Sequence, residues 1–102
     1  MELLTENAQV WVNNAFRTYK LYKTGSAQKH RASDDETLRR ALQAALNKDD
    51  SEKQDQGNGV YRVRINDGKG YLVYKVGVDG PNSAALFHYH LNYSLDIDLR
   101  VF

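Results

Sequence analysis

Two histidines in the last stretch of the sequence are spaced so that they can act together. His88 and His90 stand two residues apart in segment 85–102, where odd positions are apolar and even positions from His88 to Arg100 are polar. Strict alternation predicts a β-strand with one buried and one open face, which places both imidazoles on the open face. Imidazole suits acid–base catalysis and metal binding because it exchanges protons near neutral pH.

Cationic residues are expected on the same face. Alternation in segments 60–65 and 71–78 predicts two further strands, and the short Gly-containing segment between them is typical of a hairpin. If the strands pair as neighbours, the open face carries Arg62, Arg64, Lys75, His88, His90, Asn92 and Arg100, together with Asp96 and Asp98. This composition favours an anionic partner. It also allows phosphodiester cleavage with His88 and His90 as acid and base.

Two other interpretations of this face stay open. His88 and His90 can ligate one metal ion, with Asp96 or Asp98 completing the site. Alternatively, the face is ordinary charged surface, with cross-strand Arg–Asp pairs that limit misregister.

A second basic segment lies at residues 17–31, which contain no acidic residue and two tyrosines. Its cations are Arg17, Lys20, Lys23, Lys29 and Arg31. Cations and tyrosines of this kind suit contacts with phosphates and bases. A helix C-terminus and a solvated patch explain the same composition.

Helices are expected in the first half of the chain. In segment 3–23, apolar residues recur at helical spacing and form one stripe, with the single Trp11 at its centre as a core anchor. The sequence Ser33-Asp34-Asp35-Glu36 is a capping box that starts a second helix. This helix is expected to end near Asn47 and to bury Leu38, Ala41, Leu42, Ala45 and Leu46.

Together these elements predict one α+β domain over residues 1–102, with a helical half (about 1–47), a flexible polar connector (about 47–59) and a β half (about 60–102). Two N-terminal helices would pack on one face of a three- or four-stranded antiparallel sheet, in the order α-α-β-β-β(-β). Segment 85–102 would extend about 55 Å as one straight strand, too long for a domain of this size. It must bend, fold back or project as an arm. An arm that pairs with a second copy would give a homodimer through the C-terminal strand.

Composition excludes several classes of function. The chain has no Cys, which removes disulfides and thiolate chemistry, and its 14 basic and 13 acidic residues nearly balance. No glycine-rich phosphate loop is present, and no cofactor is expected. Because the N-terminus is acidic and no apolar run is long enough to span a bilayer, a cytoplasmic protein that does not bind membranes is expected.

The predicted order, helices followed by an antiparallel sheet with a cationic open face, is similar to the barnase-like and toxin-type endoribonucleases. The carboxylate base typical of the barnase type would be a Glu, whereas this face offers only Asp96 and Asp98. Three hypotheses follow. The first is a non-enzymatic interaction or regulatory domain that binds a protein or an anionic partner, nucleic acid included, and self-associates. The second is a metal-independent endoribonuclease that uses His88 and His90 with Arg62, Arg64 and Lys75. The third is an inhibitor or immunity-type protein.

Overall fold

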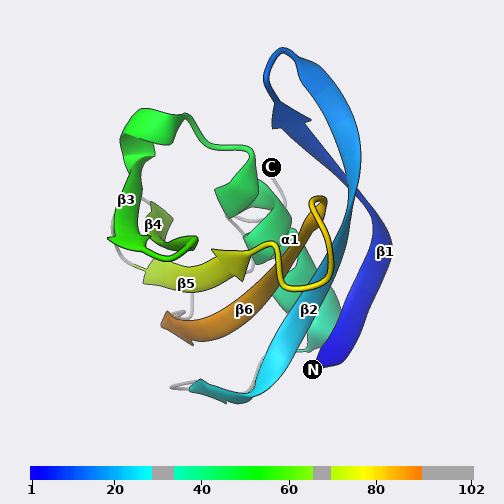
Figure 1. Ribbon diagram of the computed structural model, residues 1–102. Helices are drawn as coiled ribbons and strands as arrows, with labels where there is room; N and C mark the ends of the chain where they lie inside the picture. The colour runs from blue at the N-terminus through cyan, green and yellow to red at the C-terminus, as the bar shows by residue number, and fades with distance from the viewer. Residues whose placement is uncertain (29–33, 66–69, 91–102) are drawn as a thin grey trace.

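One α-helix packs on a six-stranded mixed sheet in the computed structural model, which describes residues 1–28, 34–65 and 70–90 (Figure 1). The elements are β1 (Glu2–Val12), β2 (Ala15–Gln28), α1 (Asp35–Leu46), the 3-10 turn η1 (Asp50–Glu52), β3 (Lys53–Gly57), β4 (Val60–Ile65), β5 (Gly70–Val76) and β6 (Ser83–His90). Across the sheet the strand order is β1-β2-β6-β5-β4-β3. Neighbours are antiparallel except for β2 and β6, which are parallel.

The predicted helix over residues 3–23 is wrong, because this segment forms the β1–β2 hairpin. Asn13 and Asn14 make its two-residue turn, both with positive φ as a type I′ turn requires, and asparagine tolerates that conformation. A two-residue turn changes which positions face inward: Ala8 and Val10 are buried before it, Tyr19 and Leu21 after it. That change of parity produced the apparent helical spacing.

Trp11 is not the core anchor that the stripe predicted. Its side chain is 49% exposed near the hairpin tip, where its ring meets Phe16 edge-on, with the ring centroids 4.8 Å apart. The two residues are cross-strand partners, so their side chains lie on the same face of the hairpin.

The second predicted helix is present as α1. It begins one residue later than the capping box suggested, with Asp34 as N-cap, whose side chain accepts a hydrogen bond from the Thr37 N–H. The five apolar residues expected on its buried stripe, from Leu38 to Leu46, are the ones that the structure buries. Figure 1 shows α1 lying across one face of the sheet, where it contacts β1, β4 and β5.

The sheet is larger than expected and not purely antiparallel, so the predicted three- or four-stranded antiparallel sheet under two helices is also wrong. Strands β4, β5 and β6 fall where alternation predicted strands. The polar segment 47–59, expected as a connector, contains η1 and β3. Segment 91–102 lies outside the described residues, and with it the predicted dimer arm.

One core holds the sheet and the helix together. Its largest fully buried side chains include Tyr74, Tyr89, Leu42 and Leu86. The described chain is a single small domain with a radius of gyration of 12.4 Å. Among the described residues, no helix has the length and apolar character needed to cross a bilayer.

Candidate anion-binding face of the sheet

The face of β4, β5 and β6 that points away from α1 brings together those cations and imidazoles assigned to it by alternation that lie within the described residues. Antiparallel partners share a face, so the register aligns two rows: Arg64–Tyr71–His90 and Arg62–Val73–His88. Lys75, opposite Val60, extends the set. We call the residues Arg62, Arg64, Tyr71, Lys75, His88 and His90 the open face.

A bulge in β6 keeps both histidines on this face. Tyr74 pairs with Leu86 and Val73 with His88, so Phe87 is an extra residue in β6. Leu86 before the bulge and Tyr89 after it are both buried, whereas Phe87 is 40% exposed. The uninterrupted alternation predicted from the sequence is therefore broken at this residue.

Tyr71 is the centre of a stacked cluster, which we define as Arg62, Tyr71, His88 and His90. The Arg62 guanidinium carbon lies 4.3 Å from the centroid of the Tyr71 ring, and the His90 ring is stacked on Tyr71 with centroids 5.9 Å apart at 16°. The Tyr71 hydroxyl is 2.8 Å from His88 Nε2 in a hydrogen bond. Four flat, partly exposed side chains thus contact one another on the sheet.

The cations of this face lack carboxylate partners within the described residues. Arg62, Arg64 and Lys75 form no ion pair there, and strands β4, β5 and β6 contain no Asp or Glu. Elsewhere, Lys20, Lys23, Arg39, Arg40 and Lys53 each lie within 4.0 Å of an acidic side chain. Positive charge on the open face is therefore not neutralised by this part of the chain.

Arg62 has one further feature. Its Nε atom is buried and makes no hydrogen bond, although a buried donor normally has a partner. The side chain packs on the Tyr71 ring, and Arg62 forms no ion pair among the described residues.

The basic segment 17–31 does not form one patch in its described part. On a strand, Arg17 and Lys23 point to the α1 side and Lys20 to the other. Lys23 is bound between Glu2 and Asp35, at 3.3 and 2.7 Å, which raises the pKa of its ammonium. Lys29 and Arg31 lie outside the described residues.

The structure brings no third metal ligand to His88 and His90 from the residues it describes, which contain no cluster of three or more ligating side chains. Asn92, Asp96, Asp98 and Arg100 lie outside the described part of the chain. The sequence reasoning missed Tyr71. Its position four residues before Lys75 was the available signal, because residues separated by an even number share a strand face.

Comparison of the chain with protein-family models, with curated proteins and with solved structures finds no match. The assignment of a function therefore depends on the geometry of the open face. An arrangement of flat cationic and aromatic groups in mutual contact can hold an anionic, planar partner. The endoribonuclease similarity no longer applies, because the predicted pair of N-terminal helices on which it depended is absent from the described fold.

Proposed function

We propose that this protein is a non-enzymatic interaction domain whose open face binds single-stranded nucleic acid. The observation that carries the proposal is the stacked cluster beside unpaired cations: Arg62 over Tyr71, His90 against it, and Arg64 and Lys75 without carboxylates among the described residues. Cations that follow the phosphates, combined with planar side chains that extend base stacking, are the usual elements of single-strand binding.

The planar geometry favours nucleic acid over an acidic protein partner. The carboxylates of an acidic protein would pair with Arg64 and Lys75 equally well, but a carboxylate makes little stacking contact with the aromatic rings of the cluster. A base, by contrast, extends the array with one of its faces, and stacking contributes about 1–3 kcal/mol per base.

Binding of a fluorescently labelled twelve-nucleotide single-stranded RNA, followed by anisotropy without added metal, tests the proposal. We expect Arg64→Gln to weaken binding several-fold and to reduce the slope of log K against log salt by about 0.7, the value for one lost contact to a single strand. Arg64 suits this test because it is exposed and makes no ion pair in the described structure.

Arg17→Gln is the matched control. Arg17 is equally exposed and loses the same charge, but it lies on the hairpin on the α1 side. An equal loss in both variants would show that only overall charge matters and would overturn the assignment to this face. Tight binding of a polyglutamate peptide with no RNA binding would instead indicate an acidic protein partner.

The contact between Tyr71 and His88 favours one second candidate, a metal-independent endoribonuclease. A hydroxyl 2.8 Å from an imidazole, with a second imidazole on the same ring, supplies two proton-transfer groups at one site. A denaturing gel of the same mixture decides between the two. Cleavage that His88→Ala and His90→Ala each abolish supports the enzyme, whereas intact RNA that is retarded on a native gel supports the binding domain.

A further inference from the structure

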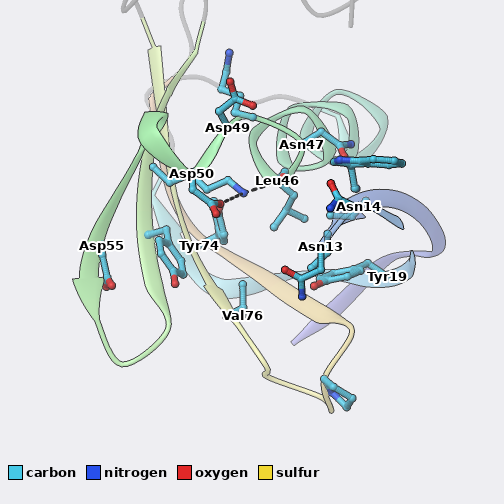
Figure 2. A pocket seen from close by; sticks show the side chains of 17 residues that line it. Asn13, Asn14, Tyr19, Leu46, Asn47, Asp49, Asp50, Asp55, Tyr74 and Val76 are labelled. Atoms are coloured by element: carbon cyan, nitrogen blue, oxygen red, sulfur yellow. Dashed lines mark hydrogen bonds and ion pairs between the residues drawn. The ribbon is translucent and has the colours of Figure 1, made fainter. Parts of the chain in front are cut away.

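A pocket of about 760 Å³ lies on the opposite side of the sheet from the open face. Figure 2 shows it between the hairpin turn at Asn13 and Asn14, the end of α1 at Leu46, and the sheet residues Tyr74 and Val76. This volume is within the range of small-molecule sites, and the lining combines aromatic, aliphatic, amide and carboxylate side chains with two lysines.

Tyrosines form the aromatic part of the pocket. The rings of Tyr61 and Tyr74 lie 5.8 Å apart, and Tyr19 and Trp11 contribute further aromatic surface. Tyr74 is only 1% exposed, yet its hydroxyl makes no hydrogen bond with the described residues. Burial raises the pKa of this phenol. A hydroxyl at the wall of a pocket, with no hydrogen bond to the described residues, is a polar group that a ligand can contact.

Two lysines, Lys48 and Lys53, already line the pocket. Lys53 Nζ donates a hydrogen bond of 2.9 Å to the Leu46 carbonyl at the end of α1 and lies 3.6 Å from Asp50. Its side chain is 15% exposed. The carbonyl end of a helix carries partial negative charge, so this region stabilises cations.

Two other carboxylates of the pocket have no cationic partner in the described structure. Asp49 and Asp55 form no ion pair there, and Asp55 accepts only the Gly57 N–H, at 2.8 Å. Asp55 is the cross-strand partner of Tyr61, so its carboxylate and that ring share the pocket side of the sheet. A cation placed there meets a carboxylate and an aromatic ring together.

We propose that this pocket binds a small organic cation, a primary ammonium carried on an aromatic body, with the ammonium at Asp55 and the body against Tyr61 and Tyr74. The site is independent of the open face. A failure of RNA binding leaves it intact, and its own failure leaves the RNA-binding proposal intact.

The only tryptophan of the chain, Trp11, lines the pocket and serves as an intrinsic reporter. Titration with phenethylammonium should change its fluorescence in a saturable way, whereas the neutral phenethyl alcohol and the anionic 3-phenylpropionate should bind about tenfold more weakly or worse. Equal affinity for the alcohol, or no saturable change with the amine, would overturn the proposal.

Asp55→Asn tests the carboxylate without disturbing the β3 turn, because the amide oxygen can still accept the Gly57 N–H. Affinity for phenethylammonium should fall about tenfold. Glu52→Gln is the matched control, since Glu52 is exposed nearby but does not line the pocket. If both variants lose the same affinity, the amine responds to the overall negative charge of this region, and the assignment of its ammonium to Asp55 is wrong.

Tyr74→Phe tests the hydroxyl with a second readout. Removing a hydroxyl that makes no hydrogen bond with the described residues should leave the melting temperature unchanged or raise it, while affinity for the amine falls several-fold. A lower melting temperature with unchanged affinity would show that the hydroxyl is structural and would contradict its role in binding.

Discussion

At the scale of single residues, Glu36 has a strongly lowered side-chain pKa. Its carboxylate accepts hydrogen bonds from Arg39, at 2.5 and 3.0 Å, and from Arg40, at 3.1 Å. The Arg39 guanidinium is the largest cause that lowers the pKa of Glu36 to about 2. Because the folded pKa lies below the unfolded value, near 4.5, these contacts stabilise the fold fully above pH 4.5 and are lost as pH falls towards 2.

Glu36→Gln should therefore lower the melting temperature at pH 7, and its difference from the wild type should shrink between pH 4.5 and 2. Thermal unfolding followed by circular dichroism over this range measures the difference. Glu52→Gln is the control, since Glu52 forms no ion pair among the described residues. A difference between Glu36→Gln and the wild type that stays constant down to pH 2 would contradict the argument.

At the scale of elements, the Asn47 side chain at the end of α1 hydrogen-bonds two backbone groups on the outer edge of β1. Asn47 Oδ1 accepts the Trp11 N–H at 2.7 Å, and Nδ2 donates to the carbonyls of Gln9 and Gln43, each at 3.1 Å. The Gln43 side chain also donates to Gln9, at 3.2 Å. Together they occupy backbone groups that would otherwise be free to pair with another strand.

Asn47→Asp should destabilise the protein by about 1 kcal/mol or more, because the carboxylate cannot donate to Gln9 and adds negative charge at the end of a helix. Urea unfolding at pH 7 gives the free energy. Asn7→Asp makes the same chemical change at an exposed position of β1 and should cost much less. An equal loss in both variants would refute the role of Asn47 at this edge.

The elements also show what could be predicted from the sequence. Helix α1 was predictable because a cap and a 3.6-residue period agree over twelve residues. Strands β4 and β5 follow from local alternation. The hairpin was missed because Asn13-Asn14 reverses the parity of buried positions, which imitates a helical stripe. The bulge at Phe87 and the pairing of β2 with β6 depend on contacts between distant residues, which local spacing does not record.

At the scale of the whole molecule, the described chain should unfold in one step. The same core includes Val10 of the hairpin, Leu42 of α1 and Leu72 of the sheet, so no part can separate without exposing apolar surface. Urea transitions followed by Trp11 fluorescence and by helical circular dichroism should coincide. An earlier transition for Trp11 would show that the hairpin unfolds independently.

The candidate site was predictable at this scale only in part. The alternation of side chains along β4, β5 and β6 was enough to predict that Arg62, Arg64, Lys75 and the two histidines share one face. This prediction did not depend on the other strands of the sheet. Tyr71, the centre of the cluster, was passed over as an apolar residue. The pocket could not be predicted, because it requires the hairpin tip to lie opposite β3, and that depends on the full strand order.

The parallel pairing of β2 with β6 has a consequence during protein synthesis. Among the described strands β6 leaves the ribosome last, yet it occupies the sheet between β2 and β5. The hairpin β1–β2 and the meander β3–β5 are each made of neighbours along the chain and meet only when residues 83–90 arrive between them. Until then, a nascent chain exposes the inner edges of β2 and β5, the edges that ribosome-associated chaperones would have to shield.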